Sequence, residues 1–209
     1  FIPLYVKKIG KYAFYSCGNL EFVEFSENSE LQSIEKFAFS STKIKKMFIP
    51  QQLKELEEGW CSGANELSAI DISPKNSNFC VKDNKILLGK SDQKSDNFDV
   101  LISAFHNIEE VCIPVNIKII LPYAFHGCNK LSTINIPANS ELQLIGEYAF
   151  SATKIKEIFI PSHVKKIGGY AFCTCVNLEN VEIPPISELQ SIERFAFFYL
   201  KIKQIFIPP

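Results

Sequence analysis

Two short apolar patterns recur along the whole chain and constrain its fold more than any other feature. The first pattern, Ile-x-x-x-Ala-Phe, ends at six phenylalanines, and Leu56/Trp60/Cys61 is a degenerate further copy. Because a short repeat implies stacked units rather than one closed core, the pattern predicts a solenoid. The six phenylalanines are Phe14, Phe39, Phe125, Phe150, Phe172 and Phe197.

The second pattern, Leu/Ile-x-x-Ile-x-Ile, follows each copy of the first. The gap from the phenylalanine to the next Leu or Ile alternates between six and five residues, as at Phe125 and Phe150, so two types of unit alternate. The sequence therefore predicts a single array over residues 1–209, made of about eight alternating units. The copies begin at Leu20, Ile44, Leu67, Ile108, Leu131, Ile155, Leu178 and Ile202.

The alternation within Leu/Ile-x-x-Ile-x-Ile is typical of a β-strand that buries one face, and it matches the leucine-rich-repeat signature. Prolines such as Pro114 and Pro161 follow many copies, and they end each strand because proline has no N–H for a sheet ladder. Stacked in parallel about 4.8 Å apart, these strands would form one long sheet. The Ala-Phe segments would cross the opposite side, where the phenylalanines form a buried spine.

Residues 74–107 interrupt the repeat. Apolar segments at 79–82 and 85–88 flank Asp83-Asn84, a pair that favours a tight turn, and a third segment, 100–102, follows a polar stretch. The interruption therefore predicts a β-hairpin insertion in the fourth unit.

The charge balance limits the kinds of partner. The chain has 22 basic and 23 acidic residues, so its formal net charge is −1, which does not favour nucleic acid or an anionic membrane as a partner. No segment reaches the about 20 apolar residues of a membrane-spanning helix, and Phe1-Ile2-Pro3 does not begin a signal peptide. We therefore expect a binding partner to be held by local features.

The repeat units resemble the BspA-like leucine-rich repeats. The likeness is clearest in the segment 160–172 and in Cys175 and Leu178, which follow it. It extends to the insertion, because arrays of that family are often interrupted by a segment similar to residues 78–83. Units that carry Cys or Thr in alternation are similar to those of surface proteins from mucosal parasitic protists. The resemblance implies a surface or secreted protein that adheres to host matrix or cell-surface proteins. It identifies no ligand and carries over no binding residue.

The cysteines are expected to be structural. Cys17, Cys128 and Cys175 stand three residues after the spine phenylalanine, where Thr42 and Thr153 stand in the other type of unit, so the position suits a small, weakly polar, buried group. Units of the same type would lie about 9.6 Å apart, which is too far for a disulfide.

No pattern in the sequence indicates a catalytic or metal site. The pair Cys173/Cys175 supplies half of a tetrahedral zinc site at best. The three histidines occupy unrelated repeat positions, and the aspartates of 92–99 lack the spacing of a calcium loop. We therefore expect no cofactor, no metal and no enzymatic activity.

Lysines recur beside the strands of the short units. A solvated ridge balanced by Glu30, Glu141 and Glu188 is the simpler interpretation, and a heparin-like ligand is the alternative. The lysines are Lys43, Lys45, Lys154, Lys156, Lys201 and Lys203.

One outward position per strand is the candidate binding surface. It alternates between aromatic and polar residues, and exposed aromatic side chains on a sheet can anchor a partner. The expected ligand-binding residues are Phe48, Phe159, Phe206, Glu24, Asp71, Asn135 and Glu182. Cross-strand shielding of the sheet would also explain the phenylalanines. The function expected first is adhesion or protein binding, and the alternative is a structural spacer that self-associates through the ends of the array.

Overall fold

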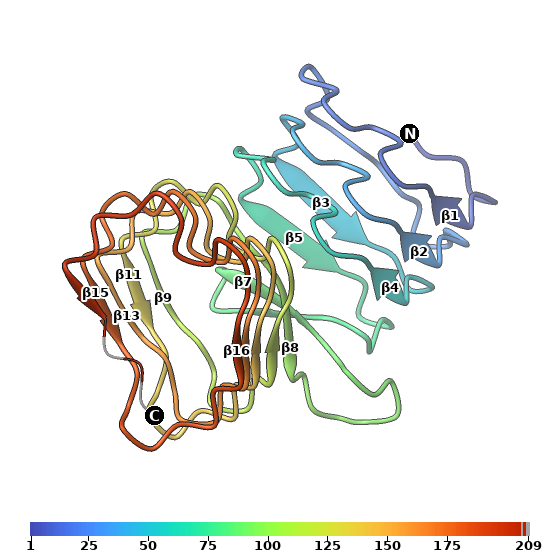
Figure 1. Ribbon diagram of the computed structural model, residues 1–209. Coiled ribbons are helices and arrows are strands. Elements are labelled where there is room, and N and C mark those ends of the chain that lie inside the picture. Colours follow the sequence, from blue (N-terminus) through green and yellow to red (C-terminus); the bar gives the residue numbers. More distant parts are fainter. Residues whose placement is uncertain (206, 208–209) are drawn as a thin grey trace.

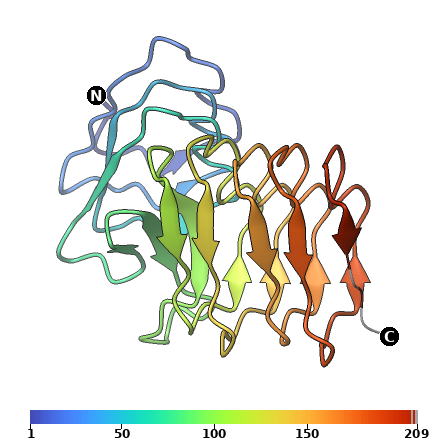
Figure 2. The ribbon, with the colours of Figure 1, turned by 90° about the vertical axis from the view of Figure 1, so that its left-hand side faces the viewer.

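The computed structural model describes residues 1–205 and 207 as a β-solenoid in two stacks of units (Figure 1). All secondary-structure elements in these residues are strands. Each complete unit contributes one strand to each of two walls, and we call these the front wall and the back wall. Figure 2 shows the strands of the second stack side by side, from green to red. The solenoid expected from the repeat is confirmed.

The front wall consists of the Leu/Ile-x-x-Ile-x-Ile segments. The proline after a strand starts a tight turn: the N–H of Val164 donates to Pro161 O at 3.1 Å, and that of Leu53 donates to Pro50 O at 3.2 Å. Its strands are β3 (Lys46–Ile49), β5 (Ala69–Ile72), β9 (Glu110–Cys112), β11 (Thr133–Asn135), β13 (Glu157–Phe159), β15 (Asn180–Glu182) and β17 (Gln204–Ile205).

The front wall is not one continuous sheet. It divides into β3-β5, β9-β11 and β13-β15-β17, each of them parallel. The expectation of one long sheet was therefore wrong at two places, between β5 and β9 and between β11 and β13.

The back wall is formed by short segments that precede each Ala-Phe, and apart from the segment 100–102 none of them was predicted as a strand. In the first stack it consists of β1 (Lys8–Ile9), β2 (Ser33–Ile34) and β4 (Glu55–Leu56). In the second stack it consists of β8 (Val100–Ala104), β10 (Ile119–Ile120), β12 (Leu144–Ile145), β14 (Lys166–Ile167) and β16 (Ser191–Ile192).

The predicted phenylalanine spine runs between the walls. Phe150 is fully buried, and its ring stacks on those of Phe125 and Phe172 with centroids 5.0 and 5.3 Å apart. Phe14 and Phe39 stack in the same way in the first stack, at 5.1 Å. The ring spacing matches the strand spacing, so each of these units adds one aromatic contact to its neighbour.

The Cys or Thr position after the spine satisfies a buried carbonyl. The hydroxyl of Thr153 donates to Phe150 O at 2.8 Å, and the Cys175 thiol also donates to Phe150 O, at 2.9 Å. Cys128 and Cys175 are buried as expected, but Cys17 is exposed, which the sequence analysis did not expect.

Each corner before the spine holds a residue with left-handed backbone, and most of these residues are aromatic. Tyr123, Tyr148 and Tyr170 have φ between 52° and 63°, and their rings stack with centroids 5.1 and 4.7 Å apart. This conformation is costly for a bulky residue, and the stacking of the rings offsets part of the cost. In the degenerate unit Gly59 holds this position, at φ 66°.

A hairpin separates the two stacks. Strands β6 (Cys80–Lys82) and β7 (Ile86–Gly89) are antiparallel around Asp83-Asn84, both of which have positive φ, and β7 pairs with β8. Neither wall passes unbroken from the first stack to the second. Figure 1 shows the two stacks inclined to each other. At their corners the rings of Phe37 and Tyr123 meet edge to face, with centroids 4.9 Å apart.

Candidate binding surface

The outward side of the front wall carries most of the residues that the sequence singled out. We call it the strand face. Asp71, Asn135 and Glu182 are exposed on it, as is Glu24, which lies two residues after the isolated bridge between Phe22 and Lys46. Phe206 lies outside the described residues.

The two described phenylalanines of the predicted stripe are only half-exposed. Phe48 pairs in register with Asp71, and Phe159 with Glu182. The Phe48 ring packs against the core, so it is less exposed than its outward position alone predicts. A large ring on a sheet lies down over its neighbours because contact with them buries apolar surface.

The sequence analysis missed a second outward row, two residues before the first. Its Phe22 is 66% exposed, and Lys45 Nζ lies 5.7 Å from its ring centroid. The row could have been found by continuing the strand alternation one step further. It consists of Phe22, Lys46, Ala69, Glu110, Thr133, Glu157 and Asn180.

Three of the predicted residues meet in one hollow. Where β11 and β13 are not hydrogen-bonded to each other, a pocket of about 260 Å³ opens, lined by Asn135, Phe159 and Glu182 together with Glu157 and Asn180. The break in the front wall therefore creates a concave feature that a continuous sheet would lack.

A second pocket, of about 320 Å³, adjoins the first under the tip of the hairpin. Lys82, Asp83 and Lys85 lie on its hairpin side, and Lys85 Nζ is 3.4 Å from the Glu110 carboxylate. Asn135 lines both pockets, so they lie next to each other between the hairpin tip and Glu182, and we call the two together the strand-face groove.

Acidic groups dominate the far end of this groove. Within the described residues no ion pair involves Glu157 or Glu182, which lie on either side of Phe159 in the pocket lining. A half-buried ring between two free carboxylates suits a partner that presents an apolar group beside a basic one.

The predicted stripe is split in two. Glu24, Phe48 and Asp71 belong to the first stack, whereas Asn135, Phe159 and Glu182 belong to the second, and the front wall is interrupted between them. Only the second set lines the strand-face groove.

Two of the six recurring lysines, Lys45 and Lys203, are paired with carboxylates, though not with the expected ones. Lys45 Nζ lies 2.6 Å from Glu21 and 4.0 Å from Glu66, and Lys203 Nζ lies 3.7 Å from Glu179. Glu30 and Glu188 instead pair with Lys7 and Lys165. These pairs favour a solvated ridge over a heparin site.

Burial keeps two thiols and His106 in their neutral forms. Burial raises the pKa of Cys175 to about 11 and that of Cys61 to about 12, so both thiols are protonated at neutral pH. Burial lowers the pKa of His106 to about 4, and its Nε2 lies 3.1 Å from the carbonyl oxygen of His126. Within the described residues, no group of three His, Cys, Asp or Glu side chains is placed to hold a metal ion.

Thiol labelling should separate two classes of cysteine. We expect Cys17 and Cys112, which are exposed, to react with a thiol-specific reagent in the folded protein, whereas Cys61, Cys128 and Cys175 react only after unfolding. Mass spectrometry of labelled peptides measures this. Labelling of Cys128 in the native state, or a disulfide that joins any two of these residues, would contradict the packing role.

No helix within the described residues is long and apolar enough to cross a membrane.

Three solved structures resemble this fold. The first is a leucine rich cell surface protein from Faecalibacterium prausnitzii, with a TM-score of 0.68 and 22% identity over 98% of this chain and 59% of that one. The pneumococcal vaccine antigen PcpA follows, with a TM-score of 0.73 and 24% identity over 90% of this chain and 48% of that one. A leucine-rich repeat protein from Bacteroides ovatus has a TM-score of 0.56 and 22% identity over 90% of this chain and 50% of that one.

At these identities the likeness shows the fold, and the chain spans about half to three fifths of the length of those proteins. Comparison with curated proteins gives no match. The sequence itself matches the family described as "BspA type Leucine rich repeat region" in six copies, over residues 1–82 and 102–209. The chain therefore belongs to the BspA-type leucine-rich repeat family.

Proposed function

We propose that the chain is a non-enzymatic protein-binding module of the cell surface, with a host matrix or cell-surface protein as its ligand. The observation that carries the proposal is the strand-face groove, where Phe159 lies between the unpaired carboxylates of Glu157 and Glu182. A surface location is supported by the description of a structural neighbour as a cell surface protein.

Physical arguments favour this groove as a site of protein contact. Strands hold Asn135, Phe159 and Glu182 in fixed positions, so little conformational entropy is lost when a partner binds. An aromatic ring with polar groups around it is the usual composition of an energetic hot spot. The groove is lined by four front-wall strands, β9, β11, β13 and β15, and by the hairpin tip, so the partner contacts several parts of the array at once.

The test is a binding screen with the purified chain against immobilised matrix proteins, followed by substitution. For a protein that binds, Phe159→Ser should weaken the affinity by at least about fivefold, because truncation of a hot-spot aromatic costs more than about 1 kcal/mol. Glu182→Gln should weaken it as well, and the loss should shrink at high salt. Surface plasmon resonance measures both effects.

Phe198→Ser is the matched control, since Phe198 is 47% exposed at a corner of the array, away from the front wall. It should leave the affinity unchanged. Equal affinities of the wild type and of Phe159→Ser, with both proteins folded by circular dichroism, would exclude the strand-face groove as the site.

A further inference from the structure

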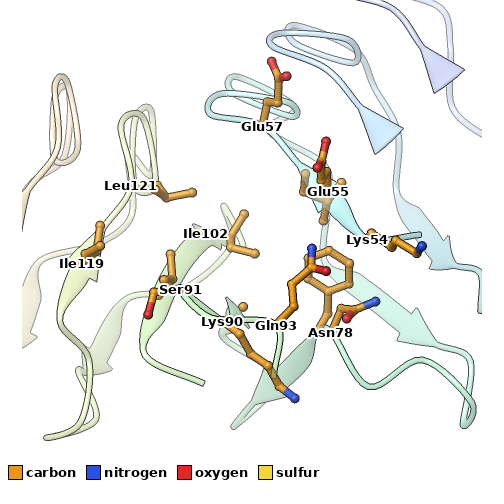
Figure 3. A pocket seen from close by; sticks show the side chains of 14 residues that line it. Lys54, Glu55, Glu57, Asn78, Lys90, Ser91, Gln93, Ile102, Ile119 and Leu121 are labelled. Carbon is orange, nitrogen blue, oxygen red and sulfur yellow. The ribbon is translucent and has the colours of Figure 1, made fainter. Parts of the chain in front are cut away.

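A groove between the two stacks lies away from the strand face. It has a volume of about 460 Å³, within the range of ligand sites. Figure 3 shows Lys54, Glu55 and Glu57 on one side of it and Ile119 and Leu121 on the other.

The β4 side of this groove is an open strand edge. In the preceding units, two back-wall carbonyls accept amide protons from the next unit: Lys7 O from Gln32 N (2.8 Å), Ile9 O from Glu35 N (3.0 Å), Gln32 O from Lys54 N (2.8 Å) and Ile34 O from Glu57 N (3.0 Å). The equivalent carbonyls of β4 belong to Lys54 and Leu56, and among the described residues neither accepts a hydrogen bond.

The chain's own next back-wall strand does not complete this edge. In an uninterrupted array β8 would follow β4, but β8 pairs with β7 of the hairpin instead. The neighbouring carbonyl of Leu53 is satisfied by the side-chain amides of Asn76 and Asn78, at 2.9 and 3.0 Å. The loop between β5 and β6 therefore bonds the first carbonyl of the edge and leaves the acceptors Lys54 O and Leu56 O without a donor in the described part of the chain.

The opposite side of the groove is apolar. Ile119 stands at the back-wall position that Lys8 and Lys166 occupy in other units and that the aliphatic Leu144 occupies on β12, and it is half-buried. Leu121 stands where Glu35 and Glu57 stand. Both side chains line the groove together with Ile102 and Phe79, so they give it an apolar wall.

The charges around the groove nearly cancel. Lys54 and Lys90 oppose Glu55 and Glu57, so the lining favours an uncharged, aliphatic occupant over an acidic or basic one. Free backbone acceptors along one side and apolar side chains along the other are the two features that bind a peptide as an added strand.

We propose that this groove binds an extended, aliphatic peptide segment of a partner protein, which adds to β4 as a parallel strand and donates its amide protons to Lys54 O and Leu56 O. The main chain of the peptide supplies the hydrogen bonds, and its aliphatic side chains contact Ile119 and Leu121. The proposal is independent of the strand-face groove.

The probe is an acetylated and amidated peptide that copies residues 117–123, because this segment makes the required bonds within the array: Leu121 N donates to Leu101 O at 2.9 Å. The peptide should bind the whole chain, and NMR should show shifts of the carbonyl carbons of Lys54 and Leu56. Absence of these shifts at about 1 mM peptide, a concentration at which even weak binding is visible, would overturn the proposal.

Two N-methylated peptides test the added strand itself. Methylation of the amide that copies Leu121 N removes a donor to β4 and should weaken binding about fivefold. The amide that copies Ile120 N points away from β4, to the outer edge of the added strand. Its methylation should therefore leave the affinity unchanged. Equal affinities of the two would show that the backbone bonds are not made.

Two variants of the protein complete the test. Ile119→Lys introduces the residue found at this position in β1 and β14, so the array should still fold. Because the ammonium group disfavours the apolar contact with the peptide, the affinity should fall about tenfold. Leu144→Lys makes the same change at the paired position on β12, which does not line the groove, and should leave binding unchanged. Equal binding by both variants would refute the proposed site.

Discussion

Replacement of Phe150 by alanine is expected to lower the free energy of unfolding by about 3–5 kcal/mol, the usual cost of truncating a buried aromatic side chain. The side chain is fully buried and stacks on one ring from each neighbouring unit, Phe125 and Phe172. In an array whose units contact only their neighbours, loss of both contacts weakens the second stack at its middle. Urea denaturation followed by circular dichroism measures the change.

Phe198→Ala is the control for this variant because it removes the same atoms from a side chain that is 47% exposed. Its unfolding midpoint, and that of Lys154→Ala at an exposed lysine in the same unit as Phe150, should stay close to the wild type. A Phe150→Ala midpoint equal to that of Lys154→Ala would rule out the spine as a source of stability.

Substitution of Gly146 by alanine should also be strongly destabilising, by about 3 kcal/mol. A Cβ atom at this position would lie 2.4 Å from Pro122 N and 2.6 Å from the carbonyl carbon of Leu121, and both atoms belong to the backbone of the preceding unit. Backbone atoms cannot rotate away as a flexible side chain can, so the two units would have to separate. Thermal and urea unfolding of the variant give the effect.

Gly18→Ala provides the matched comparison. The nearest atom to a Cβ at Gly18 is Ser16 O at 4.0 Å, so the added methyl group meets no obstacle. Its stability should differ from that of the wild type by less than about 0.5 kcal/mol. If Gly146→Ala proved as stable as Gly18→Ala, the close approach of the units at Gly146 would not exist.

The sequence predicted the features that depend on the same residue type recurring in every unit. Phe125, Phe150 and Phe172 identified the spine, and prolines such as Pro161 identified the ends of the front-wall strands. Both follow from simple physics, since a buried ring and a missing N–H act in the same way in every unit.

The back wall could not be predicted because its strands are too short to show alternation. Lys166–Ile167 and Ser191–Ile192 have two residues each, and only hydrogen bonds to the neighbouring units make them strands. The aromatic corners were overlooked although a signal existed. Tyr148 and Tyr170 each precede an Ala-Phe pair, and the recurrence of an aromatic residue there indicates a stacked position.

The candidate site was predicted in part. Asn135, Phe159 and Glu182 line one pocket, but the pocket itself results from the gap between β11 and β13, which the uniform repeat gives no means to foresee. The exposure of a ring such as Phe48 depends on how it lies on adjacent strands, and alternation reports only the side of the sheet to which it belongs.

The break of both walls at the hairpin also has a mechanical consequence. The hydrogen bonds between units run along the axis of the array, so tension applied along that axis loads them directly and peels units apart one at a time. At the boundary between β4 and β8 neither wall carries such a ladder, and side-chain contacts such as that of Phe37 with Tyr123 join the stacks there instead. Under load we therefore expect this boundary to extend before the hydrogen-bonded units of either stack separate.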